Sequence, residues 1–147
     1  MYSIQCRTDL VLKSELIPAE HLRPHEEVVT DRMIKLKEYL ETLKPYIIVP
    51  SILACKDTNV IIDGHHRYYA LQALGNVMVP VTWIDYYSDD IVTDLCANPI
   101  AKADIERAAA TGIMLEPKTS FHHVRDIHGT LHPLILLSVL FKVNPPL

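Results

Sequence analysis

The chain has 147 residues, of which 49% are apolar and 22% are charged, and its formal net charge at pH 7 is −4. This length and composition fit one soluble globular domain with enough apolar side chains for a sizeable core. The net negative charge argues against a DNA-binding domain, because such a domain normally needs a basic face to neutralise phosphates. It is compatible with a nucleotide substrate, since one local cationic pocket suffices.

The cysteines and the apolar runs indicate a reducing, intracellular setting. Cys6, Cys55 and Cys96 are far apart and form no CxxC pair, so neither a disulfide framework nor a zinc site is expected. The first ten residues lack the pattern of a signal peptide, and the apolar run at 134–141 is too short to cross a bilayer. We therefore expect a cytoplasmic protein with no membrane contact.

Up to residue 86 the chain predicts alternating strands and helices. Thr30 or Asp31 is expected to cap the main part of the first helix, and Pro50 indicates an edge position or a bulge. A turn is expected at 56–59, and Gly75 is expected to close the second helix. The expected strands are 9–18, 46–55, 59–63 and 77–86, and the expected helices are 23–43 and 65–75.

Beyond residue 86 two further helices are expected, over 88–98 and 101–112, with Ser88 and Asp104 in their early turns and Gly112 as a stop. Pro117 predicts a loop that leads into a strand and a final apolar element. The apolar stretch 132–147 suits either a core element or a homodimer contact.

The stretch Asp63-Gly64-His65-His66-Arg67 lies where a predicted buried strand meets a predicted helix. The first amides of a helix have no intrahelical partner, and the helix dipole favours an anion such as a phosphate. Gly64 allows close backbone approach, and His65, His66 and Arg67 are donors for phosphate oxygens. Asp63 would repel a phosphate unless a cation lies between them, and Mg²⁺ is the natural candidate.

These residues carry a family resemblance. IIDGHHRYYALQALG (61–75), followed by a strand that contains VPV, resembles the signature segment of the ParB/sulfiredoxin superfamily. The DNA-partitioning branch typically has Gly-Glu-Arg-Arg here, and the sulfiredoxin branch has Gly-Gly-Cys-His-Arg, with His65 in the place of its catalytic cysteine. The branch of the free L-serine kinases has Asp-Gly-His-His-Arg, as in this chain.

Two more stretches resemble the kinase branch: Pro24-His25-Glu26 ahead of the first helix, and PKTSFHHV at 117–124. The resemblance implies an α+β fold, a small mixed sheet flanked by helices in a single domain, with a core of about 10–86 and a C-terminal segment of about 88–147. It implies phosphoryl transfer from ATP or ADP, with Mg²⁺, to the hydroxyl of L-serine, giving O-phospho-L-serine. Neither the donor nor serine over another small hydroxyl acceptor is decided by these motifs.

By this resemblance, Glu26 is the candidate base that accepts the serine proton, and the adjacent Glu27 is the alternative. Asp63 is assigned to Mg²⁺ or to assisting the base, and Gly64, His65, His66 and Arg67 are assigned to the nucleotide phosphates. Arg32 either reaches a phosphate, pairs with a carboxylate or lies on a solvated helix face.

The amino-acid substrate needs a cationic or amide-rich pocket. Lys118, Thr119, Ser120 and His122 are suitable residues on one loop, although this composition is also common in exposed loops. Trp83 is assigned either to the wall of the substrate pocket or to the core.

Three other interpretations are weighed against the kinase. A non-catalytic ParB-like module that binds nucleotide or DNA is opposed by the acidic charge and by the absence of a recognisable helix-turn-helix pattern. A sulfinic acid reductase is opposed by His65 at the cysteine position. A metal site made of His123, His128 and His132 is opposed by their spacing, which matches no standard zinc pattern.

Overall fold

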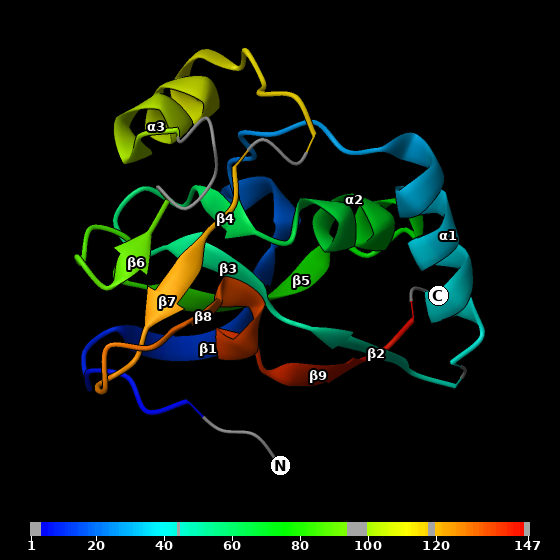
Figure 1. Ribbon diagram of the computed structural model, residues 1–147. Helices are drawn as coiled ribbons and strands as arrows, with labels where there is room; N and C mark the ends of the chain where they lie inside the picture. Colours follow the sequence, from blue (N-terminus) through cyan, green and yellow to red (C-terminus); the bar gives the residue numbers. More distant parts are fainter. Residues whose placement is uncertain (1–3, 44, 94–99, 118–119, 146–147) are drawn as a thin grey trace.

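The computed structural model describes residues 4–43, 45–93, 100–117 and 120–145. Its centre is a four-stranded sheet in the order β1 (Val11–Pro18), β5 (Met78–Ile84), β3 (Ile52–Cys55) and β4 (Ile61–Asp63) (Figure 1). β5 is antiparallel to β1 and parallel to β3, and β3 is antiparallel to β4. This mixed sheet with flanking helices confirms the predicted α+β class.

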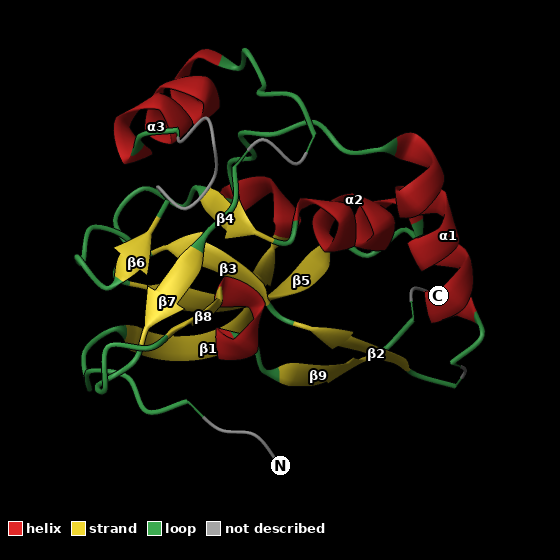
Figure 2. Ribbon diagram, viewed as in Figure 1, coloured by secondary structure: helices red, strands yellow, loops and turns green. Residues whose placement is uncertain are grey.

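Helices α1 (Thr30–Glu41) and α2 (His65–Ala73) pack against each other beside the sheet (Figure 2). Successive strand residues point to opposite faces, so the sheet supplies two apolar layers. One layer includes Ile52 and Val81, which cluster with Leu71 of α2. The other includes Leu53 and Ile84, which cluster with residues of α3 (Lys102–Thr111) and the C-terminal part of the chain.

Two smaller sheets complete the described part of the fold. β2 (Ile47–Pro50) pairs antiparallel with β9 (Leu140–Val143). β6 (Ile91–Val92), β7 (His123–Arg125) and β8 (Leu131–Pro133) form an antiparallel sheet, and short 3₁₀ turns lie at Ala19–His21 and Leu134–Leu137. The apolar C-terminal stretch thus contributes Val143 to the core, while Leu140 is 72% exposed.

Most predicted elements up to residue 86 are confirmed, but the first helix begins at Thr30, so the predicted helical start at residue 23 is wrong. The stretch 46–55 is divided after Pro50, so that β2 and β3 belong to different sheets. The predicted cap of the first helix is wrong, because Val29 occupies that position and Thr30 is already helical. Gly75 has a positive φ of 93° and its amide closes the end of α2, as expected.

The predicted helix at 88–98 is wrong over its described residues, and 94–99 lie outside them. Ser88 begins a turn, in which its carbonyl accepts the amide N–H of Ile91. Ile91 is buried and pairs with Val124 in a strand. The gain from this tertiary burial overrides the helical spacing of the sequence.

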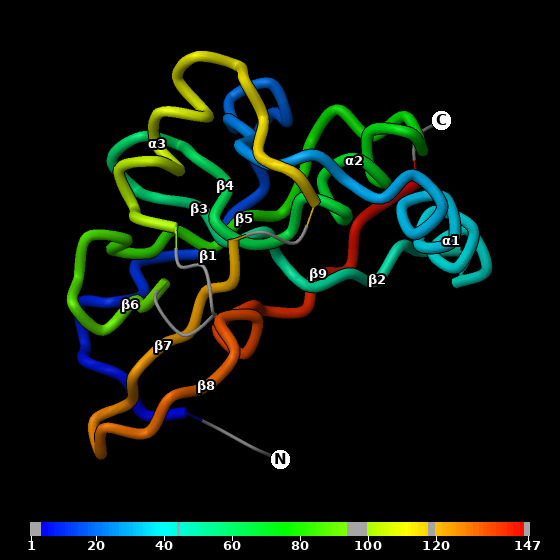
Figure 3. Tube along the Cα trace, turned by 45° about the horizontal axis from the view of Figure 1, so that its top comes forward, coloured from blue at the N-terminus to red at the C-terminus, as the bar shows by residue number. Residues whose placement is uncertain are grey.

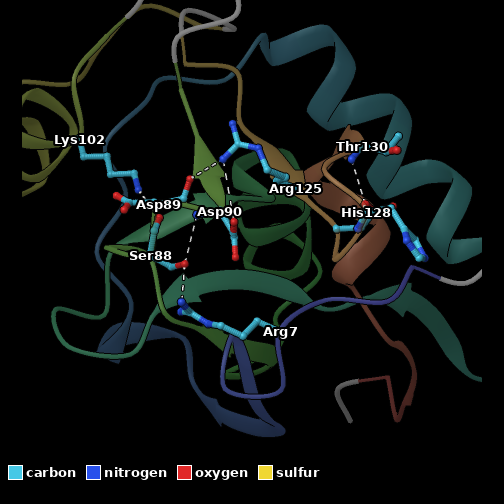
Figure 4. A network of polar contacts seen from close by, with 9 residues as sticks. Arg7, Ser88, Asp89, Asp90, Lys102, Arg125, His128 and Thr130 are labelled. Atoms are coloured by element: carbon cyan, nitrogen blue, oxygen red, sulfur yellow. Dashed lines mark hydrogen bonds and ion pairs between the residues drawn. The ribbon is translucent and has the colours of Figure 1, made fainter.

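A polar network fixes this turn to other parts of the chain (Figure 4). Nη2 of Arg7 donates to the Ser88 hydroxyl, and Nζ of Lys102 donates to the Ser88 carbonyl. Nη1 of Arg125 donates to the carbonyl of Asp89. The turn is therefore tied to the N-terminal segment, to α3 and to β7.

Among the helices of the described residues, none combines the length and the apolar character needed to span a bilayer.

Gly64 occupies the turn between β4 and α2, and its φ of +113° strongly favours glycine. An added Cβ would lie 2.8 Å from Nη2 of Arg67, which is held by the Ser51 carbonyl. We predict that Gly64→Ala lowers the free energy of unfolding by about 1–3 kcal/mol, measured by urea denaturation.

Gly112→Ala is the matched control. Gly112 also has a positive φ, of +74°, but nothing lies within 4 Å of an added Cβ. The free energy of unfolding of Gly112→Ala should fall by only about 1 kcal/mol, because alanine disfavours the left-handed backbone conformation. Equal losses in the two variants would contradict the role given to the Gly64–Arg67 contact.

Candidate functional site

A cavity of about 210 Å³ lies at the junction of β4 and α2. Three chain segments line it: Glu26 from the segment before α1, residues 62–67 from the junction, and Ser120 with Phe121 from the segment before β7. Figure 3 shows these segments converging beside α2. A larger cavity of about 590 Å³ lies at the opposite end of α2, and Glu20 is the single ionisable residue in its lining. The smaller cavity is lined by several ionisable side chains and is therefore the better candidate for a catalytic site.

The segment that carries Glu26 is held by backbone hydrogen bonds on both sides. The amide of Arg23 donates to the Asn59 carbonyl and the Arg23 carbonyl accepts from Ile61, both at 2.9 Å. On the other side, the His25 carbonyl accepts from Leu115 at 2.9 Å and the amide of Glu27 donates to the Leu115 carbonyl at 2.8 Å. The backbone at Glu26 is therefore fixed before any side chain contributes.

The two histidines that begin α2 add side-chain support to the same segment. The amide of His25 donates to Nε2 of His65, and the amide of Val29 donates to Nε2 of His66, each at 3.1 Å. Burial is the main cause that lowers the pKa of both imidazoles, that of His65 well below its ordinary value. A neutral ring is required here, because an imidazolium cannot accept a hydrogen bond at either nitrogen.

Arg67 points back from α2 beneath the turn at Gly64. Its Nη2 donates to the Ser51 carbonyl at 3.0 Å and lies 3.8 Å from Oδ2 of Asp63. The guanidinium thus links the start of β3 to the end of β4 while it lines the cavity. The sequence predicted a phosphate contact for His65 and Arg67, whereas the structure gives both side chains partners within the protein.

Glu26 is 7% exposed and its carboxylate accepts a very short hydrogen bond from the Ser120 hydroxyl. Burial raises the pKa of Glu26, and the nearby Asp63 carboxylate raises it further, while the hydrogen bonds from Ser120 oppose both effects. Glu27 is exposed and does not line the cavity. Of the two predicted candidates for the base, the geometry therefore favours Glu26.

His25 is fully buried beside Glu26, and the sequence analysis gave it no role of its own. Its Nδ1 lies 2.6 Å from the Ile61 carbonyl and its Nε2 lies 3.0 Å from the Ser120 hydroxyl. Burial is the main cause that lowers the pKa of His25, to about 4. Its position within Pro24-His25-Glu26 was the only sequence signal. Phe121, 53% exposed at the cavity, was also missed, because an aromatic residue next to Ser120 carries no pattern of its own.

The remaining predicted site residues lie in different places. His122 is buried away from the cavity lining, and its Nε2 lies 3.0 Å from the Tyr86 hydroxyl. Trp83 does not line the cavity. Its side chain packs against the core, which agrees with the second of its two predicted roles. Its indole N–H donates to Glu15 at 2.7 Å, beside a separate hollow next to β1. Lys118 and Thr119 lie outside the described residues.

Arg32 is exposed on α1 and lies close enough to His66 to help lower the pKa of that imidazole. It is not a lining residue of the cavity.

Two carboxylates, those of Glu26 and Asp63, line the cavity. Over the described ranges no group of three or more His, Cys, Asp or Glu side chains is arranged to hold a metal ion. Mg²⁺ commonly binds one or two carboxylates and completes its shell with substrate phosphates and water, so the Asp63 carboxylate fits Mg²⁺ that arrives with a nucleotide.

No protein-family model matches this chain. It is 38% identical over 77 residues to a ParB-like protein of Sulfolobus acidocaldarius, covering 52% of this chain and 37% of the relative. It is 35% identical over 105 residues to an ATP-dependent L-serine kinase of Desulfurococcus mucosus, covering 67% of this chain and 40% of the relative.

An ADP-dependent L-serine kinase of Thermococcus kodakarensis is 33% identical over 84 residues, covering 51% of this chain and 32% of the relative. Over half to two thirds of its length, this chain is therefore similar to proteins named ParB-like or L-serine kinase. Among solved structures, a free serine kinase in complex with AMP aligns with 61% of this chain and 37% of its own chain, at 29% identity and a TM-score of 0.48. The chain thus matches well under half the length of these relatives.

Burial of His122 lowers the pKa of its imidazole from 6.5 to about 3. Because the unfolded chain takes up this proton first, the contribution to stability is complete above pH 6.5 and is lost as the pH falls towards 3. The wild-type protein should lose unfolding free energy when the pH falls from 7 to 5. We predict that this loss is about 2 kcal/mol smaller in His122→Gln, measured by urea denaturation at both pH values.

His21→Gln, at an exposed histidine, is the control for the substitution itself. An unchanged pH dependence in His122→Gln would show that His122 is not the buried neutral group described above.

Proposed function

We propose that this protein is a free L-serine kinase that transfers a phosphoryl group from ATP or ADP to the serine hydroxyl, giving O-phospho-L-serine. The observation that carries the proposal is the position of the Glu26 carboxylate. It is buried, it lines the cavity at the start of α2, and its pKa is raised. The L-serine kinases among its relatives support the same reaction. Because the chain matches less than half of each relative, the activity remains a proposal.

Glu26 acts as the general base in this proposal. Phosphoryl transfer depends on positioning, on charge neutralisation and on a group that orients the attacking hydroxyl. A carboxylate with a raised pKa is a stronger proton acceptor than an ordinary one, and burial is the main cause of that rise here. The backbone hydrogen bonds on both sides of Glu26 fix its position, as catalysis requires.

The donor phosphates are proposed to lie at the first turn of α2, where the backbone amides after Gly64 have no intrahelical partner. His66 is the more accessible of the two histidines, and Arg67 contributes its charge from beneath Gly64. A cavity of about 210 Å³ is smaller than typical ligand sites. It therefore accommodates the reacting groups, with the nucleoside extending outside it.

Mg²⁺ would be held by Asp63 together with the donor phosphates, and would neutralise the charge that develops on the transferred group. Ser120, with Lys118 and Thr119 from the same loop, is proposed to face the amino acid. Phe121 joins this set because it lines the cavity. His122 and Trp83 do not line it, so we assign the substrate to the other residues. The division into a core of about 10–86 and a C-terminal segment remains a prediction.

A non-catalytic ParB-like module is the second candidate, favoured by the match to a protein of that name over half of the chain. The acidic net charge opposes DNA binding as its role. Retention on DNA that weakens steeply with salt, without phosphoserine formation, would support this candidate over the kinase.

Glu26→Gln tests the base most directly, because the substitution keeps the shape of the side chain and removes its proton affinity. We predict that it lowers phosphoserine formation by at least about 100-fold while nucleotide binding, measured by calorimetry, changes little. Glu27→Gln is the matched control: it makes the same change at the adjacent, exposed position and should retain activity. Full activity in Glu26→Gln would assign the base to another group.

A further inference from the structure

Glu26, Ser120 and His25 lie in a line, each within hydrogen-bonding distance of the next. The Ser120 hydroxyl contacts Oε2 of Glu26, and it also lies 3.0 Å from Nε2 of His25. The imidazole itself is fully buried. The proposed base is therefore connected through one hydroxyl to a histidine that solvent does not reach.

The tautomer of His25 is determined by its other ring nitrogen. Nδ1 lies 2.6 Å from the Ile61 carbonyl oxygen, and a carbonyl oxygen only accepts hydrogen bonds. Nδ1 must therefore carry a hydrogen. In a neutral imidazole Nε2 is then an acceptor that faces the Ser120 hydroxyl.

The Ser120 hydroxyl has a single hydrogen and two acceptors. When Glu26 is ionised and His25 is neutral, the Glu26 carboxylate and Nε2 of His25 compete for that hydrogen. Only one of the two contacts is then a hydrogen bond at any moment. One additional proton completes the chain: a protonated Glu26 donates to Ser120, and Ser120 donates to His25.

We propose that Ser120 and His25 are positioning residues that prepare Glu26 to receive a proton, because the proton taken from the acceptor hydroxyl completes a hydrogen-bond chain that lacks one hydrogen at rest. This inference rests on the proposed kinase function for its role in catalysis. The shared hydrogen-bond chain itself is a property of the folded protein.

The reaction step balances as follows. The serine oxygen forms a bond to the transferred phosphorus as the bond from phosphorus to the nucleotide oxygen breaks, and the hydroxyl proton moves to Glu26. The Glu26 carboxyl then donates to Ser120 Oγ, whose own hydrogen turns to Nε2 of His25. When the product leaves, the proton returns to solvent from Glu26.

Other ionisable groups surround this chain and contribute to its titration. Asp63 at the end of β4 acts on Glu26, and His65 at the start of α2 contacts the His25 ring edge-to-face with 4.5 Å between ring centroids. The ring of His122, in the segment before β7, lies 6.5 Å from that of His25. Nε2 of His25 also lies 4.0 Å from Oε2 of Glu26, so the charge of Glu26 acts on His25 directly as well as through Ser120. A variant at Ser120 removes only the connection through the hydroxyl.

The test follows the ¹⁵N resonances of the His25 ring as a function of pH in protein labelled at histidine. We expect Nδ1 to be the protonated nitrogen of neutral His25. We also expect the Nε2 resonance to show a step as Glu26 titrates, because the Ser120 hydrogen then turns to it. The step should shrink in Ser120→Ala, which leaves only the direct 4.0 Å contact between Glu26 and His25, and should disappear in Glu26→Gln. It should return to its full size in Ser120→Thr, which restores a hydroxyl. Exposed His21 is the internal control in every spectrum.

An Nε2 step that is identical in wild type and Ser120→Ala would overturn the proposal, as would a hydrogen on Nε2 of neutral His25. The readout does not need turnover. If the Nε2 step depends on Ser120 but the protein has no kinase activity, the hydrogen-bond chain is retained and the kinase function is rejected. If the protein is an active kinase but shows no such step, the kinase function is retained and the hydrogen-bond chain is rejected.

Discussion

Two imidazole nitrogens, Nε2 of His65 and Nε2 of His66, hold the backbone of residues 25–29 against the first turn of α2. Each accepts one amide hydrogen, so both rings serve the structure as neutral acceptors. The segment they hold carries Glu26 and leads directly into α1. The helix α2 and the proposed base are therefore parts of one arrangement, and loss of either acceptor would leave a backbone amide without its partner, at a cost of about 1–3 kcal/mol where it is buried.

The same junction is connected to distant parts of the chain through Ser51. The carbonyl of Ser51 accepts from both Arg67 and the Ser138 hydroxyl, and the Ser51 hydroxyl accepts from the amide of Val139. Ser51 lies at the break between β2 and β3, where Pro50 ends one strand. The residues that precede β9 thus help to fix Ser51, the partner of the cavity-lining Arg67, without lining the cavity themselves.

The sequence was most informative where local rules decide the structure. The apolar runs, Gly64 and Gly75 predicted the strands, the turn and the helix end of the central unit, since each depends on backbone geometry that only certain residues allow. Pro50 was expected to mark an edge position or a bulge in one strand, and it instead ends β2 ahead of a separate strand. It failed at 88–93, where burial of Ile91 against Val124 decides the structure and no local pattern reveals that pairing. The cap of α1 failed for a similar reason, because the group that receives the Val29 amide comes from His66, 37 residues further along the chain.

At the candidate site, the structure brings some of the predicted residues together and gives others different contacts. Glu26, Asp63 and Ser120 line one cavity, as the sequence and the resemblance together implied. The roles of His65 and Arg67 required tertiary contacts, because the same donor-rich side chains that suit a phosphate also suit a backbone carbonyl or amide. Trp83 shows the opposite limit: its strand was predicted correctly, but its surroundings depend on how β5 pairs within the sheet, where Trp83 lies opposite Ala54 of β3.

The most direct measurement is to incubate the protein with Mg²⁺, L-serine and either ATP or ADP, and to follow the products by ³¹P NMR. The account predicts an O-phosphoserine resonance with at least one donor, accompanied by the corresponding loss of nucleotide phosphate. Bound nucleotide with no phosphoserine from either donor would contradict it.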